Sequence, residues 1–160
     1  MNLILEYQTF NKKNIFFQEP VKNTVMDDSN FVRIIYSNKD FILNGIYIKI
    51  NVNKNTLQKN NFINYENIII EDNIEDKLQD KLQDENKLVF QFIETLEKYI
   101  LDKYNSHHIH CYKIKDQIMY LLNKINNCNN NRIVFSYILK ISGLWQTETH
   151  IGITYKFIYI

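Results

Sequence analysis

The residues best equipped for metal chemistry lie in one short segment. His107, His108, His110 and Cys111 stand together, and Cys128 follows further along the chain. A structural zinc ion needs four ligands in a tetrahedral arrangement, usually two from each of two short segments. The second segment offers one cysteine and no histidine, which favours the alternative of a polar loop with a buried thiol. The sequence therefore predicts no zinc site, and no other metal or cofactor.

No motif in the sequence marks a catalytic centre. The glycines are limited to Gly45, Gly143 and Gly152, so a phosphate-binding loop and a dinucleotide-binding glycine motif are both missing. Neither a nucleophile elbow nor a zinc-protease motif occurs. The carboxylates gather in 71–85, a run typical of a solvated helix rather than of the mouth of a pocket. We therefore expect a protein that binds a partner, and not an enzyme.

Aromatic residues beside cations give the stronger lead. The chain has 11 Tyr and 10 Phe, and several of them share a predicted strand with a cation: Phe31 with Arg33, then Phe41 and Tyr47 with Lys49. A ring can stack on a nucleobase for about 1–3 kcal/mol while a nearby cation tracks the phosphates. The alternative is that these rings pack under helices or in a dimer interface. Composition alone leaves both interpretations open.

The elements that position these residues are predicted strands. Residues 31–36 and 41–50 are rich in β-branched and aromatic side chains, and the polar stretch 37–40 suits a hairpin turn between them. Gly45 in mid-strand suggests a bulge or a bend. A further strand is expected at 62–71. Alternation within 41–50 predicts a buried face with Ile42, Ile46, Ile48 and Ile50, and an opposite face with Phe41, Leu43, Tyr47 and Lys49.

The middle of the chain changes to a helical period. Apolar residues at helical spacing predict a helix over 85–104 with Asp84 as its N-cap, and a shorter helix over 114–125. Two closing strands are predicted at 132–142 and 151–160, where apolar and polar residues alternate.

Strands, then helices, then strands is the order of an α+β domain. At 160 residues the chain fits one domain, and a domain of this size buries about two-thirds of its unfolded surface. We expect residues 1–160 to form a small OB-like antiparallel β-barrel. Residues 72–131 would be a helical insert between its third and fourth strands.

Composition narrows the setting. Ile, Asn and Lys are abundant, Ala is absent and Arg occurs only at 33 and 132, which points to an AT-rich genome. The net charge of +1 excludes a globally basic protein, so a nucleic-acid site must come from local clustering of charge. Two cysteines predict a reducing compartment rather than a secreted disulfide scaffold. No apolar run approaches the roughly 18 residues of a membrane span, so no membrane partner is expected.

Three segments together resemble a family of small proteins encoded by large double-stranded DNA viruses. They are VKNTVMDDSNFVRIIYS (21–37), LNGIYI (43–48) and KISGLWQTETHIGITYKF (140–157), and residues 52–131 have no counterpart. In arrangement they are also similar to OB-fold single-stranded DNA-binding proteins of such viruses and of some phages. There a Trp-bearing turn leads through a Gly into a closing Tyr/Lys/Phe strand. The phage-type proteins end in an acidic tail, whereas this sequence ends in FIYI, so recruitment through a tail is not expected.

This resemblance implies a sequence-tolerant single-stranded DNA-binding protein of viral DNA replication or repair. It implies a place in the virus factory, in the host cytoplasm or nucleus, or in the virion. The alternative is a non-enzymatic structural or assembly protein of a giant-virus virion or factory. A homodimer and viral replication proteins stay open as partners beside the nucleic acid. Trp145 can equally plug the end of the barrel. The implied contact residues are Arg33, Phe41, Tyr47, Lys49, Lys140, Trp145 and Lys156.

Overall fold

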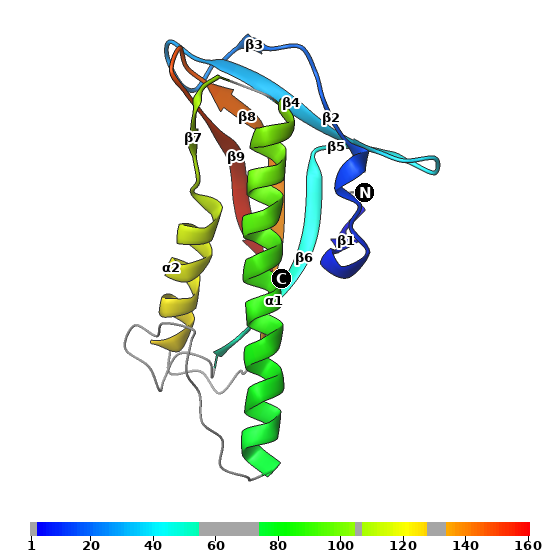
Figure 1. Ribbon diagram of the computed structural model, residues 1–160, viewed down its shortest axis with the longest axis vertical. Coiled ribbons are helices and arrows are strands. Elements are labelled where there is room, and N and C mark those ends of the chain that lie inside the picture. Colours follow the sequence, from blue (N-terminus) through cyan, green and yellow to red (C-terminus); the bar gives the residue numbers. More distant parts are fainter. Residues whose placement is uncertain (1–2, 55–73, 105–106, 128–133) are drawn as a thin grey trace.

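The computed structural model describes residues 3–54, 74–104, 107–127 and 134–160. Within them, two α-helices accompany one mixed sheet of nine strands (Figure 1). The predicted α+β class is therefore confirmed. The sheet does not close on itself, so the described residues do not form the expected OB-like barrel.

Strands predominate before the helices and after them. The first six are β1 (Leu5–Glu6), β2 (Ile15–Phe17), β3 (Val21–Lys22), β4 (Asn30–Ser37), β5 (Ile42–Asn44) and β6 (Ile46–Asn53). Two 3-10 turns, η1 (Tyr7–Thr9) and η2 (Lys12–Asn14), separate β1 from β2. The last three strands are β7 (Ile109–Cys111), β8 (Val134–Gln146) and β9 (His150–Tyr159). The strand predicted at 62–71 lies outside the described residues.

Both predicted helices are present. They are α1 (Ile74–Tyr104) and α2 (Ile114–Asn126), and the parallel strand β7 stands between them in the chain. Because α1 begins at Ile74, Asp84 lies inside the helix, and the prediction that it is the N-cap is wrong.

The long strand β8 organises the sheet. One of its edges pairs with β9 along residues 137–146. The other edge pairs first with β6, through residues 134–141, and then with β4, through residues 143–146. A register shift between Ile141 and Gly143 marks the change of partner. A Cβ atom on Gly143 would lie 2.3 Å from the carbonyl oxygen of Val32, so only glycine lets β4 approach β8 this closely.

Gly45 reverses the alternation between β5 and β6. Its φ of 100° is a conformation that glycine adopts without strain. Before it, Phe41 and Leu43 pack against the core while Ile42 is 72% exposed. After it, Ile46, Ile48 and Ile50 are buried, as predicted. The prediction that Ile42 shares their face is wrong, because the bend at Gly45 moves the strand out of phase by one residue.

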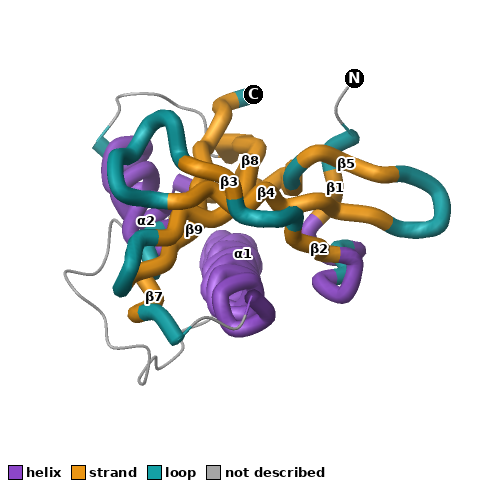
Figure 2. Tube along the Cα trace, turned by 90° about the horizontal axis from the view of Figure 1, so that it is seen from above, coloured by secondary structure: helices purple, strands orange, loops and turns teal. Residues whose placement is uncertain are grey.

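Both helices contribute to one core on one face of the sheet. Figure 2 shows α1 lying along that side. Ile93 and Ile118, one from each helix, are 1% exposed and belong to the same cluster as Ile48 and Leu139 of the sheet. Alternate residues of the strands point the other way. No helix in the described part of the chain packs on that second face.

A buried carboxylate joins the two helices. Glu97 of α1 is 1% exposed, and its Oε1 accepts hydrogen bonds from the backbone N–H groups of Lys113 (2.8 Å) and Ile114 (3.1 Å). It therefore supplies the N-terminal cap that α2 lacks in its own sequence. Burial raises the pKa of Glu97 above its ordinary value, although these N–H groups act in the opposite direction.

Candidate nucleic-acid interface

The face of the sheet that no described helix covers is called the open face below. It is formed by alternate side chains of four strands. These are Phe31, Arg33 and Ile35 of β4, Tyr47, Lys49 and Asn51 of β6, Ser136, Ile138, Lys140 and Trp145 of β8, and Thr154, Lys156 and Ile158 of β9. Six of the seven predicted contact residues are on it.

Strand pairing brings the predicted cations together. Tyr47, Lys140 and Lys156 are register partners across β6, β8 and β9, and therefore form one row. In the next row, two residues further along β6, Lys49 lies between Glu6 of the edge strand β1 and Ile138 of β8. Residues far apart in the sequence thus present their charges on a single surface.

An aromatic row lies toward the other end of the open face. Phe31 and Trp145 are register partners, and Trp145 is in turn the partner of Gly152 in β9. A Cβ on Gly152 would lie 2.6 Å from Cζ2 of Trp145, and a Cβ on Gly143 would lie 2.6 Å from Cζ of Phe31. Each ring therefore lies over a glycine of the neighbouring strand. Both side chains are partly exposed, as a surface that stacks on a base requires.

Most cations of the open face carry no carboxylate partner. The guanidinium carbon of Arg33 lies 5.8 Å from the centroid of the Phe31 ring, and its Nη1 donates to Oδ1 of Asn44 at 3.0 Å. The Lys49 ammonium lies 3.9 Å from the Glu6 carboxylate. In the described ranges no carboxylate is within ion-pair distance of Arg33, Lys140 or Lys156. The open face therefore has a net positive charge.

Two predicted residues differ from expectation. Tyr47 points to the open face but is only 9% exposed, and the ammonium of Lys140 lies 5.3 Å from its ring centroid. A base can stack on Tyr47 only if Lys140 moves aside. Phe41 is not on the open face at all, because Gly45 changes the phase of the strand. Its ring stacks on Tyr36 at 6.2 Å, on the core side.

Sequence reasoning missed the role of the glycines. Gly143 and Gly152 determine where the rings of Phe31 and Trp145 lie. A signal was present in the sequence, since each is a glycine in a strand otherwise rich in large residues. The register that places it beside an aromatic residue was not predictable from one chain.

In the described part of the His–Cys segment, the ring of His110 contacts other side chains of the chain and does not converge with the neighbouring His and Cys side chains on a metal site. Nδ1 of His110 lies 3.2 Å from the Tyr112 hydroxyl and 3.6 Å from the Asp102 carboxylate. Over the ranges that the structure describes, no group of three or more His, Cys, Asp or Glu side chains is arranged to hold a metal ion. Cys128 lies outside those ranges. The absence of zinc stays a prediction, and one equivalent of zinc in purified protein, lost on Cys111→Ser, would contradict it.

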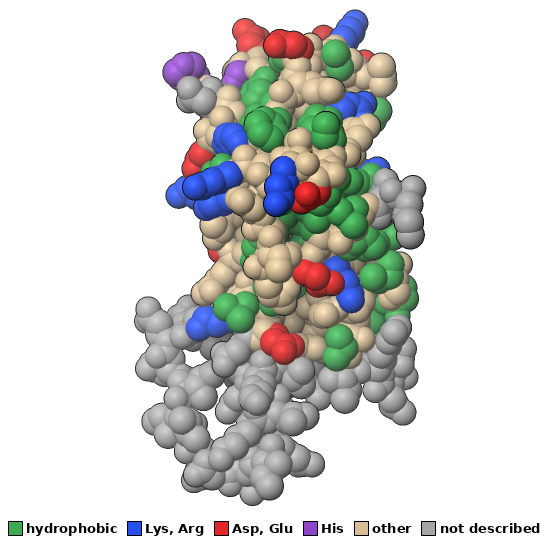
Figure 3. Space-filling view, turned by 90° about the vertical axis from the view of Figure 1, so that its right-hand side faces the viewer, with side chains coloured by type: hydrophobic (Ala, Val, Ile, Leu, Met, Phe, Trp, Pro, Cys, Tyr) green, Lys and Arg blue, Asp and Glu red, His purple; other side chains and the backbone are tan. Residues whose placement is uncertain are grey.

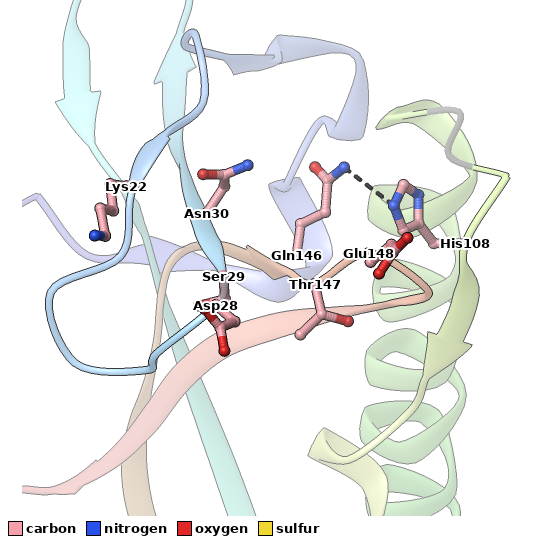
Figure 4. Close-up of a pocket in the computed structure, with 8 residues that line it drawn as sticks. All are labelled: Lys22, Asp28, Ser29, Asn30, His108, Gln146, Thr147 and Glu148. Atoms are coloured by element: carbon pink, nitrogen blue, oxygen red, sulfur yellow. Dashed lines mark hydrogen bonds between the residues drawn. The ribbon is translucent and has the colours of Figure 1, made fainter.

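A polar hollow of about 450 Å³ lies at the end of the sheet near the aromatic row (Figure 4). Its lining includes Lys22, Asp28, His108, Gln146 and Glu148. The side-chain nitrogen of Gln146 is 3.2 Å from Nε2 of His108. The mixture of one lysine with two carboxylates gives the hollow no preference for an anion, so it is not part of the interface.

No family model, curated protein or solved structure matches this chain. The assignment of a function therefore rests on the geometry of the open face. Of the helices in the described residues, none combines the length and the apolar character needed to cross a bilayer.

Proposed function

We propose that this protein binds single-stranded nucleic acid on the open face without strong sequence preference. The observation that carries the proposal is the combination of unpaired cations with rings that lie over glycines, on a face that no helix of the described residues covers. Proteins that hold single strands combine phosphate contacts with base stacking in this way. OB-like barrels use a sheet face for the same purpose.

The proposal assigns separate roles to the aromatic rings and to the cations of the open face. Trp145 and Phe31 supply the stacking surface. Arg33, Lys140 and Lys156 lie further along strands β4, β8 and β9 and contact the phosphates of the bound strand. Side chains on one face of a strand recur every 6.4–6.8 Å or so, which lets neighbouring rows engage successive parts of one extended strand. Neither interaction reads base edges, so binding tolerates any sequence.

An assembly protein is the second candidate, and apolar side chains near the open face favour it. Ile42 is 72% exposed and Ile160 is 47% exposed. Ile138 and Ile158 are register partners on the open face itself and are partly exposed. Apolar contacts between protein copies strengthen in salts such as sulfate, whereas phosphate contacts weaken as salt rises. Salt dependence therefore separates the two candidates.

The direct test is titration with oligothymidylate at several salt concentrations. Trp145 is the chain's single tryptophan, so its fluorescence reports stacking at the proposed site. We expect quenching on binding and a slope of log affinity against log salt of about −2, from roughly 0.7 for each of three phosphate contacts. Folded protein that shows no binding at low salt would exclude the proposal.

Variants separate the stacking role from the charge role, with a labelled oligonucleotide followed by anisotropy. Trp145→Leu keeps an apolar cover over Gly152 but removes the ring, and should cost roughly 1–3 kcal/mol of binding at every salt concentration. Lys156→Ala should instead reduce the magnitude of the salt slope by about 0.7. Lys124→Ala on α2 is the matched control and should change neither quantity.

A further inference from the structure

We infer that the bound strand continues beyond the open face, around the edge strand β2, into a cleft between the η1–η2 segment and α1. This inference rests on the proposed function and extends it to a longer site. It starts from the pairing of β2 with β4. Phe16 is the register partner of Ile35, so its side chain is on the same side of the sheet as Arg33. Phe16 is 52% exposed.

A group of lysines and rings follows at this edge. We call it the edge cluster, and it consists of Lys12, Lys13, Phe16, Tyr99 and Lys103. The ammonium of Lys103 lies 5.4 Å from the Phe16 ring centroid and 5.8 Å from that of Tyr99. The ammonium of Lys12 lies 4.8 Å from the same Tyr99 ring. The cluster therefore connects β2 to α1 through alternating cations and aromatic rings.

The edge cluster is not neutralised by neighbours. Among the described residues, no carboxylate lies within ion-pair distance of its three lysines. Lys103 also donates to the carbonyl oxygen of Ile15 at 2.6 Å, which fixes its ammonium at the rim of the sheet. Figure 3 shows Lys and Arg side chains at the left margin of the molecule, with an Asp or Glu side chain beside them. An anionic strand that leaves Arg33 meets the lysines of the edge cluster next.

Beyond the cluster the surface is hollowed. A cleft of about 640 Å³ separates the η1–η2 segment from α1, and Lys12 and Lys13 lie on its lining together with Phe10 and Phe92. Among the described residues that line this cleft, none is acidic. The rings of Phe10 and Phe92 meet edge to face at 5.9 Å. The cleft thus offers the same chemistry as the open face, cations beside aromatic rings, at the end of a continuous path.

Oligonucleotide length distinguishes this path from the open face alone. Single OB folds occupy about 4–16 nucleotides, which gives a range for the lengths to test. We expect an oligothymidylate of about 5 nucleotides to occupy the open face alone, and one of about 15 nucleotides to occupy the whole path. The variant is Lys12→Ala combined with Lys13→Ala. Its matched control is Lys115→Ala combined with Lys124→Ala, which removes the same charge from α2.

We expect the edge variant to reduce the salt slope for the long oligonucleotide by about 1.4, from roughly 0.7 for each lysine, and to leave the short one unchanged. The control should bind both lengths like the parent. If the edge variant also binds the long oligonucleotide like the parent, while Lys156→Ala weakens both lengths, the path is wrong and the proposed function stands. An equal loss for both lengths overturns the path as well, because the edge cluster would then be part of the primary site. Parent protein that binds neither length overturns both.

Discussion

The two faces of the sheet are built from adjacent residues of the same strands but have opposite chemistry. In β8, Leu139 is fully buried under the helices, whereas Lys140, the next residue, is partly exposed on the open face. Their partners in β6 repeat the contrast, since Ile48 is fully buried and Tyr47 points to the open face. The same strands therefore form both the buried core side and the open face, because successive side chains of a strand point to opposite faces of the sheet.

The two faces of the sheet differ in how much they stabilise the fold, and the core side contributes more. Burying a large aliphatic side chain contributes about 1.5–3 kcal/mol, and the core side of the sheet holds many of them. Exposed charges contribute little, because water screens them. The open face is thus free to carry unpaired cations. Its exposed charged side chains can change with little effect on folding.

The largest effect is expected where the helices cover the sheet. Leu139→Ala should reduce the free energy of unfolding by about 2–5 kcal/mol, because it leaves a cavity between β8 and the helices. Lys140→Ala, its neighbour on the other face, should change that free energy by no more than about 0.5 kcal/mol. Urea denaturation of both variants measures the contrast. Similar costs for the two would mean that the faces do not differ as described.

A smaller effect is expected within the open face, at a position where packing is tight. Gly152→Ala places a methyl group where the Trp145 indole lies, and such overpacking should cost about 1–3 kcal/mol of stability. The displaced indole should also become more exposed, which shifts its fluorescence emission to longer wavelength. Thr154→Ser, on the same strand and face, is the control. An unchanged emission spectrum in folded Gly152→Ala would show that the indole does not depend on this glycine.

On the core side, the buried Glu97 predicts that the stability of the fold depends on pH. Its pKa is raised by burial and by Asp116, so the folded state holds this proton more tightly than the unfolded state. Its contribution to stability is therefore greatest below the unfolded pKa and declines as pH rises through the folded pKa. Glu97→Gln keeps an oxygen for the two α2 N–H groups and cannot ionise. The stability of the parent relative to Glu97→Gln should fall as pH rises, in urea titrations at several pH values. A constant difference would show that Glu97 ionises without cost.

The local spacing of apolar residues was sufficient to predict much of the core side of the sheet and of α1. Alternation in 46–50 predicted the buried isoleucines, and the helical spacing of apolar residues predicted the core side of α1. These features depend on the nearest few residues, which is why one sequence reveals them. The seven predicted contact residues came from the resemblance rather than from alternation, and six of them lie on the open face.

Apart from the N-cap expected at Asp84, which lies inside α1, the failures involve a change of phase or a distant partner. Ile42 and Phe41 were assigned to the wrong faces because the positive φ of Gly45 reverses the alternation. A closed barrel was expected because the local sequence gives no sign that β8 changes its partner from β6 to β4 near Gly143. The edge cluster was missed because Lys103 and Phe16 are far apart in the chain. Pairings of this kind become visible only in three dimensions.

The smallest effect concerns Lys49, which among the described cations of the open face is the one with a carboxylate partner. Lys49 lies 3.9 Å from Glu6, and both side chains are substantially exposed, so the pair is weak and screened. Part of the charge of Lys49 is nevertheless already balanced. Lys49→Ala should therefore lower the salt slope of oligothymidylate binding by less than the roughly 0.7 expected for Lys156→Ala.

Glu6→Gln should act in the opposite direction and tighten binding slightly at low salt, with the gain disappearing as salt rises. Glu94→Gln, which removes a carboxylate from the exposed Lys115 pair on the helices, is the control and should leave binding unchanged. If Glu6→Gln weakens binding, the Lys49 pair orients the lysine for contact instead of competing for it. In that case the pairing of Lys49 with Glu6 would support binding, and unpaired charge would not be what matters at Lys49.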